Sequence, residues 1–234
     1  MVSAATKSEA ASTFHLSATE KLSSLSGTPF LAANSAKLSG DVDLSADSAR
    51  LAGTLFGALP TQGGTAPQEI SFEVIRIGGD SWESTTGLGG LLQLGGSVPP
   101  GHWIKEDSSS SVSQIPDPGK LFDALKSRAT NVHFVGTSTV GGVATDEYQL
   151  LGSSSLIDAL GGGGSSDQSE TTGPVSIQVW VDRSDLVRRL STALKENMGP
   201  PGQVESVALT VDFTNYGQPV HIQPPPADLV LPSS

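Results

Sequence analysis

Apolar and polar residues alternate along most of the chain. From Ala36 to Leu44 the even positions are apolar or small and the odd positions are mostly polar, which predicts a strand with one buried face. Residues 47–56 repeat this pattern and predict an antiparallel partner, and Glu69–Ile77 alternates again. Further strands are predicted at Asp80–Thr85, His102–Asp107, Asn131–Thr139, Val143–Gly152, Ser176–Asp182, Asp185–Leu194, Val204–Phe213 and Gln218–Gln223. About ten or eleven strands at this spacing indicate a mainly β fold.

The N-terminal segment has a different spacing, in which apolar residues recur every three or four positions. This spacing predicts an amphipathic helix within residues 1–27, which would end before Pro29, with residues 1–9 as a flexible N-terminus. The apolar positions of this predicted helix are Ala10, Ala11, Phe14, Ala18, Leu22 and Leu25.

A second helix is predicted from Pro118 onward. Asp117 is its expected N-cap, and the proline is favourable in the first turn. Its apolar face consists of Leu121, Phe122 and Leu125.

Two glycine-rich stretches separate the predicted strands. Residues 153–173 are rich in Gly and Ser and predict a flexible surface loop. Residues 87–96 place four leucines among five glycines, which suits either the mobile mouth of an apolar cavity or a loop packed under the core. We expect residues 1–234 to form one domain, because a β-rich fold of this size is commonly a single domain.

Charge and composition narrow the classes of partner. The chain has 24 acidic and 13 basic residues, a net charge of −11, which argues against binding to nucleic acid or to anionic lipid surfaces. The absence of cysteine excludes disulfides, thiolate metal sites and cysteine catalysis. No apolar run approaches the ~20 residues of a bilayer-spanning helix, and the first residues lack the pattern of a secretory signal.

The motifs of common catalytic and cofactor sites are incomplete. Leu92 stands where a dinucleotide-binding loop needs its third glycine, and Val140 replaces the last glycine of a nucleophile elbow. The segment around Asp43 resembles the start of a calcium loop, but Ala46 occupies its glycine position, and Asp182 suits a turn cap better than catalysis. The four histidines are distant in sequence: His15, His102, His133 and His221. We therefore predict no enzyme, no cofactor and no metal.

Several motifs resemble those of actinobacterial lipoproteins of the LppX/LprG type. Residues 179–182 (VWVD) followed by 186–189 (LVRR) are similar to a strand-turn-strand motif of these proteins. Residues 211–228 (VDFTNYGQPVHIQPPPAD) resemble their C-terminal signature of an aromatic residue, Gly, Pro, Val and a proline run. Residues 78–82 (GGDSW) and 102–105 (HWIK) resemble two upstream strands.

The resemblance implies a LolA-like fold, in which a strongly curved antiparallel sheet forms an unclosed barrel around two or more helices on its concave side. It also implies an extracytoplasmic protein of the cell envelope that holds acylated lipids or glycolipids between the sheet and the helices. Such proteins are usually anchored through an N-terminal lipid, so we expect an anchor in the native protein that is absent from this chain.

No motif marks the expected lipid site, which is assigned from apolar positions on the strands and the second helix. The cavity lining is predicted to be Leu38, Val42, Leu44, Leu51, Leu55, Phe72, Val74, Phe122, Leu125, Val179 and Val181. The rim is predicted to be Leu88, Leu91, Leu92 and Leu94, with Trp82 and Trp103. Each of these residues has an alternative role as ordinary core, and Trp180, of opposite parity to its neighbours, should point away from their face.

We expect a monomeric, non-enzymatic domain that binds acylated lipids or glycolipids, with transfer to or from an envelope exporter or acceptor as an extension of that role. One alternative is an envelope interaction or signalling module on the same fold, with its interior filled by side chains. Ligand pockets usually exceed about 300 Å³, so a smaller void would favour that alternative. Another is a hydrolase of lipids or glycans, which requires a Ser–His pair within hydrogen-bond reach.

Overall fold

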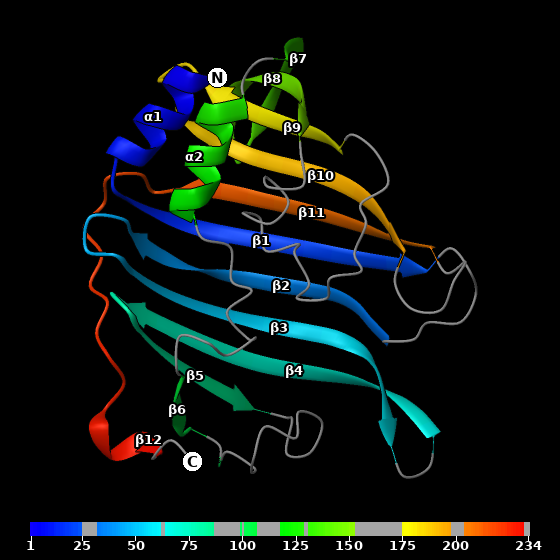
Figure 1. The fold of residues 1–234 in the computed structure, drawn as a ribbon, viewed down its shortest axis with the longest axis vertical. Coiled ribbons are helices and arrows are strands. Elements are labelled where there is room, and N and C mark those ends of the chain that lie inside the picture. Colours follow the sequence, from blue (N-terminus) through cyan, green and yellow to red (C-terminus); the bar gives the residue numbers. More distant parts are fainter. Residues whose placement is uncertain are drawn as a thin grey trace.

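The chain forms one large curved sheet with two helices on one of its faces (Figure 1). The structure, a computed structural model, describes residues 1–24, 32–61, 64–86, 99, 101–106, 118–128, 131–152, 175–197 and 204–231. The helices are α1 (Val2–Ala10) and α2 (Pro118–Arg128), and a 3₁₀ turn, η1, spans Ala227–Leu229. The strands are β1 (Thr13–Ser24), β2 (Ala32–Asp43), β3 (Ser48–Thr61), β4 (Gly64–Ile77), β5 (Asp80–Thr86), β6 (Trp103–Glu106), β7 (Val132–Val140), β8 (Val143–Gly152), β9 (Val175–Asp182), β10 (Val187–Asn197), β11 (Val204–Thr214) and β12 (Val230–Leu231).

The sheet is built from two series of consecutive antiparallel strands. Its twelve strands follow the order β12-β6-β5-β4-β3-β2-β1-β11-β10-β9-β8-β7. The series β1–β6 and β7–β11 meet where β1 pairs with β11, and the short β12 pairs parallel to β6. The order ends at β12 and β7, so the sheet does not close into a barrel. The predicted mainly β, curved and unclosed antiparallel sheet is confirmed, with twelve strands among the described residues.

Two glycines allow close approach of neighbouring strands in the middle of the sheet. A Cβ atom on Gly40 would overlap the carbonyl oxygen of Arg50 and lie 2.8 Å from the Cα of Leu51. A Cβ atom on Gly53 would lie 2.6 Å from the carbonyl oxygen of Lys37. Glycine inside a strand often marks such a close approach or a tight bend. We conclude that these two positions permit the curvature of β2 and β3.

The helices pack on the face of the sheet that we call the inner face. Phe122 of α2 is fully buried, and its ring centroid lies 5.9 Å from that of Phe14 in β1 and 5.6 Å from that of Phe213 in β11. Helix α1 is bound to β10 because the backbone N–H of Val187 donates to the buried Ser8 hydroxyl at 2.9 Å. Aromatic packing and this hydrogen bond fix both helices over β1, β10 and β11.

The predicted second helix and the hairpin at Gly141-Gly142 are confirmed. The buried apolar face of α2 consists of Leu121, Phe122 and Leu125, as the spacing indicated. Both hairpin glycines have positive φ, 56° and 84°, which the tight primed turns between two strands require.

The prediction of a long helix within residues 1–27 is wrong beyond Ala10. The chain turns at Ser12, which has a φ of 63°, and continues as β1. Phe14 and Ala18 are four residues apart, a spacing that fits a helix but also places both on one face of a strand. Helix α1, residues 2–10, takes in most of the segment 1–9 that was expected to be flexible, and its Ala4, Ala5 and Ser8 are buried.

The predicted strand at Gln218–Gln223 is also wrong. The chain leaves β11 through a turn with positive φ at Asn215 and Gly217, and the N–H of Gly217 donates to the carbonyl of Thr13. It then runs past the ends of β2–β5 to β12 (Figure 1), so no neighbouring strand is placed to pair with it. The apolar alternation there lacks a sheet partner.

Other expectations fall outside the described residues. These are the N-cap at Asp117, the Gly/Ser-rich loop at 153–173 and the leucine- and glycine-rich stretch at 87–96.

Candidate functional site

The predicted lining residues that lie on strands share the inner face. Register pairs Leu38 with Gly53 and Gly53 with Phe72, so these positions are on one side of the sheet. Val42, Leu51, Val74, Phe122, Leu125, Val179 and Val181 are buried, and Leu38, Leu44, Leu55 and Phe72 are partly exposed. The structure thus places these side chains in one layer with the helices.

This inner layer divides into two parts. One part is a core around the helices, and it includes Val42, Leu51, Phe122, Leu125, Val179 and Val181, with Leu38 and Leu44 against its border. The other part lies on β3 and β4, outside that core, and consists of Leu55, Ile70, Phe72 and Val74. Both helices lie over the other half of the sheet (Figure 1). The apolar inner face is therefore wider than the part that α1 and α2 cover.

The predicted rim residues have different placements. Leu88, Leu91, Leu92 and Leu94 are outside the described residues. Trp82 pairs with Ile75, whereas Val74 pairs with Glu83, so Trp82 lies on the outer face, across the sheet from the lining. Trp82 pairs with Lys105 of β6, so Lys105 also lies on the outer face. Trp103 is two residues before Lys105 on the same strand and therefore shares that face. The Lys105 ammonium lies 5.7 Å from the centroid of the Trp82 ring, and the two groups form a cation–π contact.

The expected orientation of Trp180 is confirmed. Val179 and Val181 are buried on the inner face, whereas Trp180 is partly exposed and faces the other way. The guanidinium of Arg189 lies 5.9 Å from its ring centroid and also donates twice to the carboxylate of Asp212, an interaction that raises the pKa of Arg189. Trp180 is therefore part of a surface cluster on the outer face.

An acidic residue occupies an inner-face position that sequence reasoning missed. Glu20 follows Phe14, Leu16 and Ala18 on the same side of β1, and it pairs with Leu209 of β11 and Ala36 of β2. Burial raises the pKa of its carboxyl group. The signal was present in the sequence as a charged residue in the apolar series of β1, but the helical interpretation of residues 1–27 concealed it.

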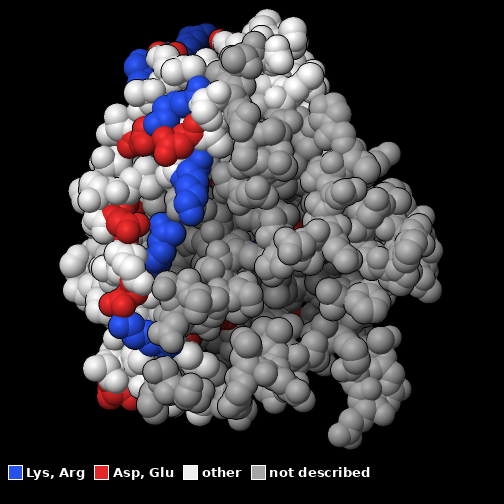
Figure 2. All heavy atoms as spheres, viewed as in Figure 1, with Lys and Arg blue, Asp and Glu red and all other residues white. Residues whose placement is uncertain are grey.

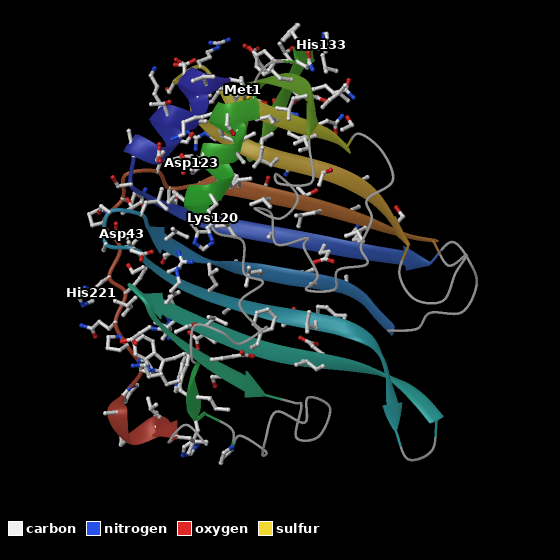
Figure 3. The ribbon with its side chains drawn as sticks, viewed as in Figure 1. Met1, Asp43, Lys120, Asp123, His133 and His221 are labelled. Carbon is white, nitrogen blue, oxygen red and sulfur yellow. The ribbon has the colours of Figure 1, made fainter. Side chains whose placement is uncertain are left out.

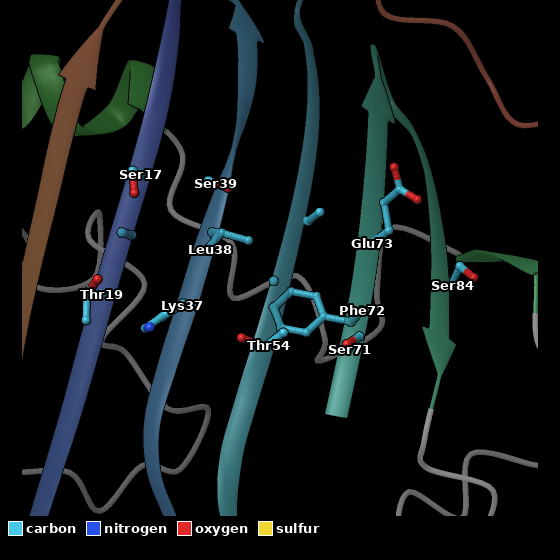
Figure 4. A pocket seen from close by; sticks show the side chains of 13 residues that line it. Ser17, Thr19, Lys37, Leu38, Ser39, Thr54, Ser71, Phe72, Glu73 and Ser84 are labelled. Carbon is cyan, nitrogen blue, oxygen red and sulfur yellow. The ribbon is translucent and has the colours of Figure 1, made fainter. Parts of the chain in front are cut away.

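A polar groove of about 530 Å³ opens on the outer face of β1–β5 (Figure 4). Its polar side chains come from two rows of outer-face positions, and they include Ser17, Thr19, Lys37, Ser39, Thr54, Ser71, Glu73 and Ser84. Between these two rows the groove is also lined by residues whose side chains belong to the inner face: Ala18, Leu38, Gly53 and Phe72. Six hydroxyl side chains, Lys37 and Glu73 line this groove together with apolar residues, so it lies on a different face from the predicted lipid site.

A smaller pocket of about 390 Å³ lies between the end of α1, the start of α2 and the β2–β3 turn. Asp43, which lines it, accepts hydrogen bonds from the Ser45 hydroxyl at 2.6 Å and from the backbone N–H groups of Ser45 and Ala46. The hydroxyl bond is the main reason that the pKa of Asp43 is lowered. Asp43 therefore holds this turn.

Asp182 has the turn-capping role that the sequence indicated. Its Oδ1 atom accepts the N–H groups of Ser184 and Leu186, and its Oδ2 atom accepts the Nε–H of Arg188 at 2.6 Å. Burial acts to raise the pKa of Asp182, but these hydrogen bonds outweigh it and the pKa is lowered. The carboxylate fixes the β9–β10 turn.

Three of the histidines lie apart in the described part of the chain. His133 lies at the β7 end of the molecule and His221 on the segment after β11 (Figure 3), and His15 contacts Asp41 at 2.8 Å. No group of three or more potential metal ligands occurs in the described part of the chain. Basic and acidic side chains alternate along one border of the surface (Figure 2), and ion pairs such as Lys126–Glu9 and Arg76–Asp47 join opposite charges.

Comparison with known proteins gives matches among solved structures. LprF from Mycobacterium bovis is similar with a TM-score of 0.52 and 15% sequence identity, over 96% of each chain. The lipoprotein LppX of Mycobacterium tuberculosis matches with a TM-score of 0.45 and 15% identity, over 95% of this chain and 97% of LppX. No protein-family model and no curated protein sequence matches the chain. Neither described helix is long and apolar enough to cross a lipid bilayer. The likeness to LprF shows that the chain has the fold of the LppX/LprG type, which its motifs resemble.

Proposed function

We propose that this protein binds acylated lipids or glycolipids on the inner face of its sheet, without catalysing a reaction. The observation that carries the proposal is the apolar surface of β3 and β4, which belongs to the inner face but lies outside the core that packs against α1 and α2. The fold, shared with LprF, supports it. We further propose a monomer of the cell envelope, anchored by an N-terminal lipid in the native protein, that exchanges lipid with an envelope exporter or acceptor.

Burial of an acyl chain supplies enough free energy for such binding. Each buried CH₂ group contributes about 0.8 kcal/mol. One long acyl chain therefore gains on the order of 10 kcal/mol before the costs of binding are subtracted. No charged partner on the protein is needed for this affinity.

The experiment has two parts. The purified protein is extracted with organic solvent and the extract is analysed by mass spectrometry, while delipidated protein is titrated with a fluorescent fatty acid. Two variants at adjacent positions of β3 supply the comparison. Leu55→Glu places a charge on the inner face, and Phe56→Glu places the same charge on the outer face. We expect bound lipid in the wild type, and probe binding that Leu55→Glu weakens at least about tenfold and Phe56→Glu leaves unchanged.

Thermal melting of both variants distinguishes loss of binding from loss of folding. If Leu55→Glu does not fold, Leu55→Ala, which adds no charge, replaces it in the binding experiment. Absence of both co-purified lipid and probe uptake in the folded wild type would contradict the proposal. Equal weakening by the two Glu variants would place the binding elsewhere than the inner face.

A second candidate is an interaction module on the same fold. The observation that favours it is the edge strand β7, where Phe134 and Val135 are 61% and 53% exposed. Exposed apolar side chains on a strand with an unpaired edge are a common feature of protein-binding surfaces. Wild-type protein that holds no lipid and takes up no probe would favour this candidate.

A further inference from the structure

Glu20 interrupts an otherwise apolar series on the inner face. On β1 it follows Phe14, Leu16 and Ala18, which are all buried. Its neighbours across the strands are Ala36 and Leu209. A carboxyl group at the inward-facing position of a strand is unfavourable unless a donor or another polar group meets it there.

The strands beside Glu20 supply no such group among the described side chains. On the inner face of β2 the adjacent residues are Ala36, Leu38 and Gly40, and on β11 they are Val207, Leu209 and Val211. No charged group on these two strands directly faces Glu20.

The carboxyl group of Glu20 is half-buried and makes no hydrogen bond or ion pair with the described residues. Burial raises its pKa, so Glu20 acquires its charge at a higher pH than an exposed glutamate. The group therefore lies on an apolar surface, in the same cross-strand row as Ala36 and Leu55, without a partner among the described residues.

We propose that Glu20 makes the inner face selective for uncharged acyl lipids that carry hydroxyl groups, such as monoacylglycerols, over the anions of free fatty acids. This inference rests on the proposed function. A carboxylate accepts hydrogen bonds from lipid hydroxyl groups, and such charge-assisted hydrogen bonds are stronger than neutral ones. The same carboxylate repels a fatty-acid carboxylate, and the repulsion is strong where the surroundings are apolar.

The test compares two ligands of equal chain length, monopalmitoylglycerol and palmitate, below their micellar concentrations. Each displaces an uncharged probe, a pyrene-labelled fatty alcohol, from delipidated protein at pH 8, because a high pH favours the charged form of a carboxyl group whose pKa is raised. The variant is Glu20→Gln, which keeps the size of the side chain and removes the charge. The control is Glu69→Gln, because Glu69 is an exposed residue of the outer face that pairs with Phe56.

We expect the wild type and Glu69→Gln to bind monopalmitoylglycerol at least about tenfold more tightly than palmitate. In Glu20→Gln the two affinities should approach each other, mainly because palmitate binds more tightly. Equal affinities in the wild type, or an unchanged preference in Glu20→Gln, overturn the role of Glu20 while lipid binding stands. A preference lost equally in Glu69→Gln also overturns it, because net charge then explains the effect. Failure of the probe to bind the wild type overturns the proposed function itself and this inference with it.

Discussion

The substitution Gly40→Ala tests whether a missing side chain permits the close approach of β2 and β3. The added methyl group would overlap the carbonyl oxygen of Arg50, and it would lie 2.8 Å from the Cα of Leu51, well inside ordinary contact at 3.4 Å. Both obstacles are backbone atoms, which cannot rotate away as a side chain can. The two strands must separate, or the sheet must flatten locally.

We expect Gly40→Ala to lower the free energy of unfolding by about 3 kcal/mol, at the upper end of the usual cost of overpacking. Gly53→Ala should cost less, about 2 kcal/mol, because one of its obstacles is the Phe72 ring, which is able to move. Gly136→Ala is the matched control, since no atom lies within 4 Å of the added methyl group on β7. It should leave stability unchanged or raise it by about 0.5 kcal/mol.

Urea unfolding followed by tryptophan fluorescence measures all three variants, and far-ultraviolet circular dichroism confirms that each starts from a folded sheet. The order of stability should be Gly136→Ala, then Gly53→Ala, then Gly40→Ala. If Gly40→Ala unfolds at the same urea concentration as Gly136→Ala, the curvature does not depend on this glycine and the reasoning fails.

Three further changes test the core and the buried carboxyl groups by urea unfolding. Phe122→Ala should lower the free energy of unfolding by about 3–5 kcal/mol, because the ring is fully buried between β1 and β11; a loss below about 1 kcal/mol would contradict its anchoring role. Glu20→Gln should raise stability at pH 7 and have little effect at pH 4. Its raised folded-state pKa means that the wild type loses stability as the pH rises through that pKa, so an equal effect at both pH values would refute the burial of the charge. Asp182→Asn should cost about 1–3 kcal/mol at pH 7 and less near pH 3. Because the folded-state pKa of Asp182 is lowered, its carboxylate stabilises the wild type above pH 3.8, the usual aspartate pKa, and this stabilisation is lost as the pH falls through the folded-state pKa. A loss of stability in Asp182→Asn that does not depend on pH would contradict this reasoning.

Local alternation predicted most of the strands correctly because each pattern depends only on neighbouring residues. The strands around Leu38, Leu51 and Phe72 have their apolar residues on one face, and the sheet buries that face or places it beside the core. The segment from Phe14 to Leu22 was misassigned, since a four-residue spacing suits both a helix and one side of a strand. Only pairing with β2 and β11 decides between them.

The faces of Trp82 and Trp103 depend on register, which a short strand does not reveal by itself. A shift of one residue between β4 and β5 moves every side chain to the opposite face. The pairing of Ile75 with Trp82 sets the outer face for both tryptophans. The prediction of a strand at residues 218–223 was wrong for a related reason. Apolar and polar residues alternate there, but the segment crosses the ends of other strands and does not pair with one.

The pairing of β1 with β11 joins residues about 200 positions apart, such as His15 and Thr214. Contacts of such sequence separation form late in folding, since closing so large a loop costs much conformational entropy. Each arm of the sheet is a series of consecutive hairpins that does not need the other arm for its local pairing. A chain emerging from a ribosome or a translocon therefore completes its central seam only after β11 has appeared, and until then β1 and β10 are open edges that are exposed to aggregation.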